Sequence, residues 1–303
     1  MTTEARPFAR WGRRAAAALS ACLLAACGTP APAGKDVAKP AMWLVEDDDT
    51  QLYLLGTMHA LPAATDWDHG QVGAAIAAAD ELVLELSPAE LAKVGGVFQR
   101  LAPRTAPLPV DRRLPTNALA SYRALEASGS GQPFGGDTLD DWAVMVLMGQ
   151  RVAQNAALSP ANGVETKLAA AFGEAGKPVS GLESAETQLM FFETLDAPTQ
   201  RTLLTNAAAG AGDAVTEVGA LTAAWSRGDI AALEKMVNDD VDAVPAARAA
   251  LLTERNRAWS RWAKARMDRP GTVLVAVGTG HLIGSDGLPT LLEAEGLKVT
   301  RVQ

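Results

Sequence analysis

Residues 51–59 read Gln-Leu-Tyr-Leu-Leu-Gly-Thr-Met-His, and residues 273–281 read Val-Leu-Val-Ala-Val-Gly-Thr-Gly-His. Each segment is a short apolar run, which is typical of a buried strand, followed by a Gly-Thr-x-His turn. Gly56 and Gly278 allow the backbone to turn sharply or to approach a ligand closely. His59 and His281 then place an imidazole at the carboxyl end of each strand. Two such turns side by side would form a site.

A single Gly-x-x-His is a weak pattern, because a chain with 27 glycines in 303 residues often produces it by chance. Either histidine alone could equally be a neutral imidazole that hydrogen-bonds a carbonyl. Two of the three histidines share the pattern, which favours a common functional role for that pair. The third, His69, is expected at the surface near a helix start, with an auxiliary ligand role as the alternative.

The first 26 residues have the pattern of an export signal. Four arginines precede an apolar run at 15–24, which is too short to span a bilayer as a mature helix. The run ends in Leu-Ala-Ala-Cys at 24–27, similar to the lipobox of bacterial lipoproteins, in which the cysteine becomes the lipidated first residue. An ordinary signal peptide with a chance cysteine at Cys27 is the alternative. Gly28, rather than Asp, follows the cysteine, and by resemblance to Gram-negative lipoproteins this favours the outer membrane, facing the periplasm, over retention in the inner membrane.

Composition divides the rest of the chain into a tether and one domain. Residues 27–41 are rich in Pro, Ala and Gly and are expected to form a flexible tether, followed by a single domain at 42–303. Removal of residues 1–26 would leave 23 basic and 34 acidic residues of the 27 and 35 in the full chain, a net charge of −11. This charge argues against nucleic acid and anionic lipid surfaces as partners, so membrane contact is expected only through the lipid anchor. No disulfide is expected, since only Cys27 would remain, and the sequence leaves the oligomeric state open.

Strands alternate with helices along the domain. Apolar runs at 42–46 and 51–55, on either side of an acidic turn, predict a β-hairpin. Helical patterns dominate 88–159 and 199–269. A helical stripe there is more typical of core than of a cofactor pocket; it consists of Trp142, Met145, Met148 and Val152. The alternation predicts an α/β (α+β) fold, a mixed sheet with flanking helices and a large helical insert.

Two acids and one arginine occupy unusual positions. Glu85 lies between two leucines at the end of a predicted strand, where a buried charge needs a partner; a solvated edge is the alternative. Glu183 ends another apolar strand just before a helix, which is where α/β sheets bind ligands, although it could equally be a structural carboxylate. Arg255 belongs to a charged run on a predicted helix at 246–269, a pattern more typical of a solvated face.

Five motifs follow one another in order: Leu-Leu-Gly-Thr-Met-His at 54–59, Leu-Val-Leu-Glu-Leu at 82–86, Lys-Pro-Val-Ser-Gly-Leu-Glu-Ser at 177–184, Glu-Arg-Asn at 254–256 and Val-Gly-Thr-Gly-His at 277–281. Together they resemble the TraB/GumN family, whose relatives include the Tiki and pheromone-shutdown proteins, from Met42 to Gln303. The resemblance implies a fold similar to the erythromycin-esterase and ChaN-like group. The Tiki branch implies a peptidase activity that depends on a divalent metal, manganese or cobalt, with zinc as a third candidate.

The resemblance also suggests roles for five side chains. His59, His281 and Glu85 are expected to hold the metal, which would lower the pKa of a bound water and polarise a carbonyl. Glu183 is expected to act as general base or further ligand, and Arg255 to stabilise an oxyanion or bind a substrate carboxylate. The expected substrate is a peptide or a small amide or ester. A non-catalytic lipoprotein that binds or sequesters a peptide or envelope component remains the alternative.

Overall fold

The computed structural model describes residues 36–129, 132–241 and 244–303. The predicted signal at 1–26, the lipobox cysteine Cys27 and the first part of the tether lie outside the described residues. Residues 36–41, which composition assigns to the tether, pack into the fold. Strand β1 (Asp36–Val37) pairs with β4 (Thr65–Asp66), and Ala38 and Ala41 are buried. Backbone hydrogen bonds hold this segment, from Ala38 N to Asp66 O at 2.6 Å and from Lys39 N to Ser226 O at 2.7 Å.

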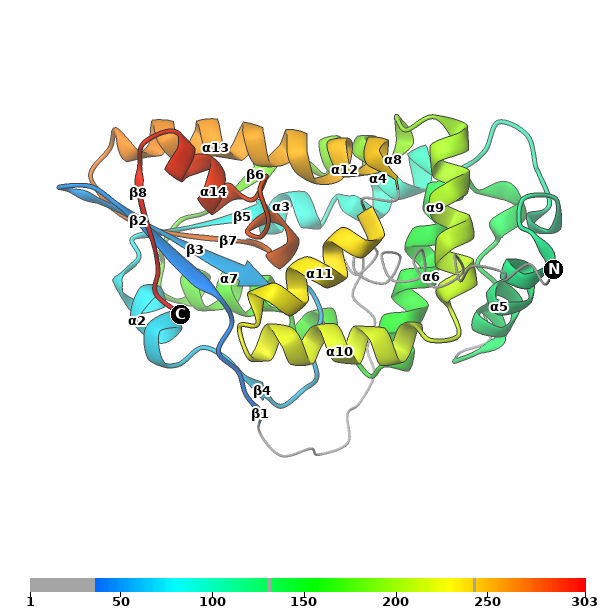
Figure 1. The fold of residues 1–303 in the computed structure, drawn as a ribbon, viewed down its shortest axis with the longest axis horizontal. Helices are drawn as coiled ribbons and strands as arrows, with labels where there is room; N and C mark the ends of the chain where they lie inside the picture. Colours follow the sequence, from blue (N-terminus) through cyan, green and yellow to red (C-terminus); the bar gives the residue numbers. More distant parts are fainter. Residues whose placement is uncertain (1–35, 130–131, 242–243) are drawn as a thin grey trace, which may run out of the picture.

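A six-stranded mixed sheet lies at the centre of the molecule, in the order β6-β5-β7-β3-β2-β8. Its strands are β2 (Met42–Glu46), β3 (Thr50–Thr57), β5 (Glu81–Leu86), β6 (Val179–Glu183), β7 (Gly271–Gly278) and β8 (Lys298–Arg301). The first four in spatial order are parallel, whereas β2 is antiparallel to both β3 and β8. The carboxyl ends of β3, β5, β6 and β7 therefore meet at one end of the sheet (Figure 1).

The predicted hairpin is confirmed in β2 and β3. The carboxylate of Asp47 closes its turn by accepting hydrogen bonds from the backbone N–H groups of Asp49 and Thr50, at 3.1 and 2.9 Å. Leu54 and Leu55 of β3 point to opposite faces of the sheet, and both are fully buried because helices cover both faces.

Helices form a layer on each side of the sheet (Figure 1). One layer contains α2 (Gly70–Ala78), α7 (Val164–Glu174), α10 (Ala214–Ser226) and α11 (Ile230–Val241). Phe172 and Trp225 are buried in the core on that side. The other layer contains α13 (Glu254–Met267) and α14 (Leu288–Ala294), with Trp259 in its core. This arrangement confirms the predicted α/β class with a mixed sheet and flanking helices.

The helical insert has a core of its own. Its main helices are α3 (Pro88–Leu91), α4 (Val94–Leu101), α5 (Thr116–Ala127), α6 (Asp141–Asn155), α8 (Ala185–Glu193) and α9 (Ala197–Gly210), and α12 (Pro245–Arg248) leads back to α13. The predicted stripe on α6 is confirmed as core, since Trp142 and Met145 are almost completely buried. Phe98 meets the Trp142 ring edge-on, with ring centroids 5.4 Å apart. The insert thus packs on its own aromatic side chains.

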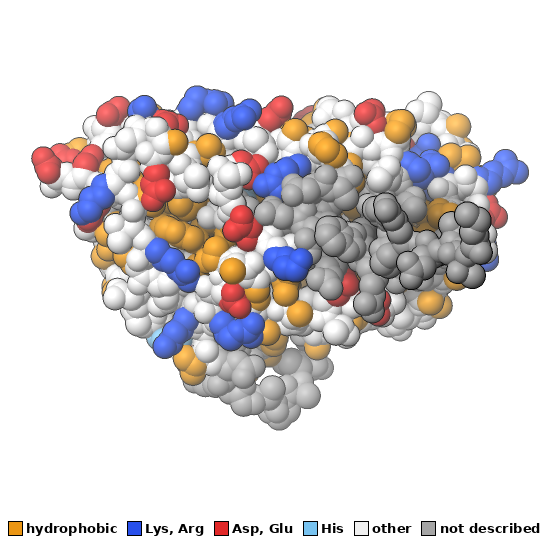
Figure 2. All heavy atoms as spheres, in the orientation of Figure 1, with side chains coloured by type: hydrophobic (Ala, Val, Ile, Leu, Met, Phe, Trp, Pro, Cys, Tyr) orange, Lys and Arg blue, Asp and Glu red, His pale blue; other side chains and the backbone are white. Residues whose placement is uncertain are grey.

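The described surface carries charges of both signs. On the face drawn in Figure 2, Lys and Arg side chains are interspersed with Asp and Glu wherever side chains are coloured. Among the helices that the structure describes, none has the length and apolar character to cross a membrane.

Candidate functional site

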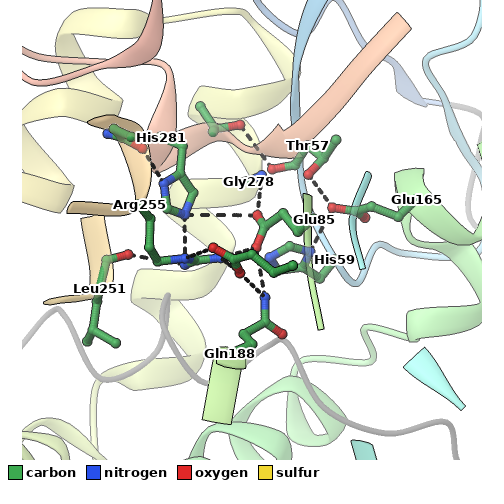
Figure 3. Close-up of polar contacts among 12 residues, drawn as sticks. Thr57, His59, Glu85, Glu165, Gln188, Leu251, Arg255, Gly278 and His281 are labelled. Atoms are coloured by element: carbon green, nitrogen blue, oxygen red, sulfur yellow. Dashed lines mark hydrogen bonds and ion pairs between the residues drawn. The ribbon is translucent and has the colours of Figure 1, made fainter. Parts of the chain in front are cut away.

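Four parallel strands and one helix bring five side chains to one place, and Figure 3 labels His59, Glu85, Arg255 and His281 among them. Glu85 and Glu183 lie at the ends of β5 and β6, and His59 follows β3 by two residues. His281 follows β7 in a short 3-10 turn, and α13 supplies Arg255 from above the sheet. The carboxyl ends of parallel strands are the usual ligand position of an α/β sheet. The residues that the sequence singles out are therefore neighbours in space.

The guanidinium of Arg255 lies at the centre of this cluster. Its Nε donates to Glu183 Oε1 at 2.8 Å, and its Nη2 donates to Glu183 Oε2 at 2.8 Å and to Glu85 Oε2 at 2.7 Å. Its Nη1 donates to the carbonyl of Leu251 at 3.1 Å and lies 3.0 Å from His281 Nε2. All five N–H donors of the guanidinium therefore have protein acceptors. In this arrangement Arg255 holds the other residues in place, and a contact with an oxyanion would require it to release one of them.

The two carboxylates on Arg255 have opposite pKa shifts. Burial alone would raise the pKa of Glu85, but Arg255, assisted by the two imidazoles and the N–H of Gly278 at 2.8 Å, holds it well below its ordinary value. Burial also raises the pKa of Glu183, and there it outweighs the hydrogen bonds from Arg255. Titratable groups whose surroundings push their pKa values apart are typical of acid–base sites.

His281 is buried and neutral. Its Nδ1 lies 2.6 Å from Asn256 Oδ1, which can only accept, so Nδ1 carries the proton and Nε2 presents its lone pair to Arg255. Burial and the positive charge of Arg255 lower the pKa of His281 to about 3. The Trp259 ring covers the imidazole, with centroids 4.4 Å apart. This imidazole is thus in the protonation state that a metal ligand requires.

His59 lies on the more exposed side of the cluster. Its Nδ1 is 2.7 Å from the Oε1 atom of Glu165, at the start of α7, and the same oxygen accepts a short hydrogen bond from Thr57 Oγ1. The side chains of His59 and Glu165 are 23% and 17% exposed, against 6% for His281. Solvent therefore reaches the cluster from the His59 side.

The two motif glycines are required by close packing rather than by a positive φ. A Cβ on Gly278 would lie 3.1 Å from Glu85 Oε1, 3.4 Å from His59 Nε2 and 3.7 Å from His281 Cδ2. The side chains expected to hold the metal therefore surround this one glycine. A Cβ on Gly56 would lie 2.9 Å from the Oγ1 atom of Thr279, so Gly56 lets the two turns pack against each other.

The donor atoms suit a divalent cation, although they are not gathered on a common point. Within the described residues, no three His, Cys, Asp or Glu side chains form a group that could hold a metal ion. Glu85 Oε1 and His281 Nε2 are 4.0 Å apart, which is within the roughly 4.4 Å that two ligands of one ion can span. Both histidines have Nδ1 beside an oxygen acceptor, as metal-bound histidines usually do. Arg255 occupies the other side of Glu85 and His281, so a cation would compete with it.

Three contributors to the site carry no assigned role from the sequence. Gln188 on α8 donates to Glu85 Oε2 at 3.0 Å and reaches Glu183 Oε2 at 3.5 Å. Glu165 holds His59, and Asn256 holds His281. Asn256 could have been inferred from its place in the Glu-Arg-Asn motif, but the other two lie on helices whose local pattern gives no such signal.

The third histidine, His69, precedes α2 and is more than one-third exposed. Its Nδ1 lies 3.4 Å from Asp66 Oδ1. Among the described residues, His69 forms its ion pair with Asp66 and none with the five residues of the cluster.

Comparison with known proteins gives one result. A family model described as the TraB/PrgY/gumN family matches residues 41–301. Neither a curated protein nor a solved structure matches the chain. The matched range includes both Gly-Thr-x-His turns, the two strand-end glutamates and the arginine of α13.

Proposed function

The chain belongs to the TraB/PrgY/gumN family, and from its site we propose that it is an envelope hydrolase that cleaves a peptide, or a small amide or ester, with a divalent metal ion. One observation carries the proposal: two carboxylates with opposite pKa shifts share a guanidinium beside two imidazoles at the carboxyl end of a parallel sheet. Such a combination of acid, base and ligand atoms suits hydrolysis.

His59, Glu85 and His281 would hold the metal, since they supply two imidazole nitrogens and an ionised carboxylate around Gly278. Manganese or cobalt fits a mixed nitrogen and oxygen donor set, and zinc is a third candidate. When bound, such an ion supplies a water of lowered pKa and polarises the carbonyl under attack.

The remaining side chains move protons and fix positions. Glu183, whose pKa is raised by burial, would take a proton from the attacking water and return it to the leaving group. Arg255 holds Glu183 and Glu85 at a fixed separation, and Gln188 bridges the same two carboxylates. Glu165 fixes the ring of His59 so that its Nε2 faces Gly278.

We also propose that the chain is exported and anchored by a lipid on Cys27, at the outer membrane facing the periplasm. The basic segment, apolar run and Leu-Ala-Ala-Cys at 24–27 support this location. Labelling cells with a fatty acid tests it: wild-type protein should carry the label in the membrane fraction, and Cys27→Ala should carry none.

The central test measures metal and cleavage on one sample. Purified protein is stripped with a chelator and titrated with manganese, cobalt and zinc against a mixed peptide library. Activity should return with metal and be lost in His59→Ala and His281→Ala, whereas His69→Ala, which replaces the histidine paired with Asp66, should remain active.

The same test separates the enzyme from its alternative. If a folded sample binds no stoichiometric metal and cleaves nothing, the hydrolase proposal fails. Peptide binding without cleavage would then favour a lipoprotein that sequesters its ligand.

A further inference from the structure

The two edges of the sheet are built differently. At one edge β8 carries Lys298 and Arg301, whose side chains contact Glu46 Oε1 at 2.5 Å and the carbonyl of Gly228 at 2.6 Å. Charged residues on an edge strand discourage another strand from pairing there. At the other edge β6 has the sequence Val-Ser-Gly-Leu-Glu, with no charged residue before Glu183. The β6 edge therefore lacks the feature that protects β8.

The backbone of β6 has hydrogen-bonding groups that face away from the sheet. Leu82 of β5 is the partner of Val179, and Leu82 N donates to Pro178 O at 3.0 Å. In a parallel ladder this pattern directs Pro178 and Ser180 toward β5 and leaves the N–H and C=O of Val179 and Gly181 on the outer side. Within the described residues, these outward groups of Val179 and Gly181 make no hydrogen bond.

The open edge is accessible and leads into the site. Ser180 and Gly181 are exposed, and Gly181 is two residues, about 6.6 Å, from Glu183 along the strand. Glu183 is the strand's last residue and is bound to Arg255. An extended chain paired with β6 would therefore run alongside the backbone of Glu183, whose side chain is 5% exposed and is bound to Arg255.

We propose that β6 binds the peptide substrate as an added strand, through the outward N–H and C=O groups of Val179 and Gly181, so that the paired chain passes Glu183. This inference rests on the proposed function, because it takes the reacting position to be beside Glu183. Pairing through backbone groups gives affinity for extended peptides with little dependence on their side chains. The substrate class is accordingly an extended segment with free backbone amides.

The first experiment leaves the protein unchanged. A short peptide of alternating valine and threonine, capped at both ends and labelled with fluorescein, is titrated with metal-free protein and binding is followed by anisotropy. An analogue with its central amides N-methylated has the same side chains but lacks the donors. It should bind at least about 10-fold more weakly, because the ladder loses its hydrogen bonds. Equal binding of the two peptides would overturn the proposal.

The second experiment changes the edge alone. Val179→Pro removes the outward N–H, and proline is tolerated on an edge strand where no ladder hydrogen bond is lost. Val179→Ala removes the same side chain but keeps the N–H, so it is the matched control. The proline variant should bind the peptide about 10-fold more weakly than the alanine variant, with circular dichroism showing both folded. Equal affinities would contradict the proposed role of Val179.

The outcomes separate this inference from the function on which it rests. If N-methylation weakens binding but no metal produces cleavage, β6 binds peptide and the hydrolase proposal fails. If cleavage occurs and N-methylation has no effect on binding, the hydrolase stands and the β6 proposal fails. A third outcome is that the wild type binds no peptide but forms a dimer, and that Val179→Pro dissociates this dimer. That result would show that a second copy of the chain pairs with β6, and it would also overturn the β6 proposal.

Discussion

The two Gly-Thr-x-His turns share a sequence pattern and differ in their surroundings. In the second turn His281 is buried beneath Trp259, with the amide of Asn256 on Nδ1 and Arg255 on Nε2. In the first turn His59 is partly exposed, and a carboxylate, Glu165, takes the place of the amide. Deep burial and the positive charge of Arg255 keep the ring of His281 neutral, and the amide of Asn256 fixes its orientation.

This difference indicates how one motif can serve two tasks. The strand and its Gly-Thr-x-His turn fix where the imidazole lies, and the residue beside Nδ1 sets the orientation of the ring. His281 belongs to a fixed ionic cluster, whereas His59 is the imidazole that solvent reaches. The site thus has a buried half, formed by His281, Arg255 and the two glutamates, and an exposed half, formed by His59 and Glu165.

The largest effect is expected from Arg255→Met. Removal of the guanidinium leaves Glu85 and Glu183 buried without their cation, so the free energy of unfolding should fall by about 3–5 kcal/mol. Urea unfolding measures the loss. Arg257→Met, at an exposed position on the same helix, should change stability by less than about 0.5 kcal/mol. Similar losses in both variants would mean that the buried half does not depend on this cluster.

The next effect concerns pH and His281 in chelated protein. The pKa of His281 is lowered to about 3 in the folded state, below the unfolded value of 6.5. Between these two pH values the unfolded chain therefore binds a proton at His281 and the native state does not. The contribution of neutral His281 to the free energy of unfolding is therefore complete above pH 6.5 and is lost as the pH falls. Between pH 6.5 and about 4.5 the slope should reach about 1.4 kcal/mol per pH unit. His281→Gln should flatten this dependence relative to wild type, and His69→Gln should not; parallel curves for wild type and His281→Gln would contradict a buried neutral ring.

A smaller effect should distinguish the two motif glycines. In Gly56→Ala the new Cβ meets Thr279 at 2.9 Å, and this overpacking should cost about 1–3 kcal/mol in thermal unfolding. Gly278→Ala should cost less stability, because its Cβ meets the ends of side chains, but it should reduce metal binding more. Adding Thr279→Ala to Gly56→Ala should recover part of the loss. If the stability changes of Gly56→Ala and Thr279→Ala simply add in the double variant, a direct contact between the two turns would be excluded.

The smallest effect on stability is expected from Glu165→Gln on the exposed half. The pair with His59 is partly solvated, so the loss should be about 1 kcal/mol or less. Metal affinity should nevertheless fall about 10–100-fold, as it does when a partner of a metal-bound histidine is removed. Isothermal titration with manganese measures it. Unchanged affinity would indicate that Glu165 only supports the turn.

Local pattern predicted the sheet and the positions of the site residues well. Short apolar runs, and the glycines, prolines and acidic residues that end them, predict three features: the hairpin, the two turns and the strand-end positions of Glu85 and Glu183. These patterns depend on residues close together in the sequence. The charged run around Arg255, which pattern alone favoured as solvated, is buried at that residue because α13 covers the sheet end. The roles assigned to these side chains remain predictions.

The rest of the site depends on tertiary packing. Gln188 and Glu165 reach the cluster only because α8 and α7 return against the strand ends, and no local signal distinguishes them from other polar helix residues. The segment 36–41 takes its place in the fold through its contacts with β4 and other elements, which its composition does not reveal. Sequence pattern thus specified the strands, and packing decided which helix residues meet them.

The hydrogen bond between the two turns has a consequence for the order of folding. Thr279 Oγ1 donates to the carbonyl of Thr57 at 3.0 Å, across 222 residues of chain. Adjacent strands β3 and β7 are separated by the whole helical insert, so closing this pair carries a large loop entropy and is intrinsically slow. A nascent chain that ends before β7 lacks the strand that joins β3 to β5, so the site cannot assemble. The site therefore assembles late in biosynthesis, only after β7 has been synthesised and has inserted between β5 and β3.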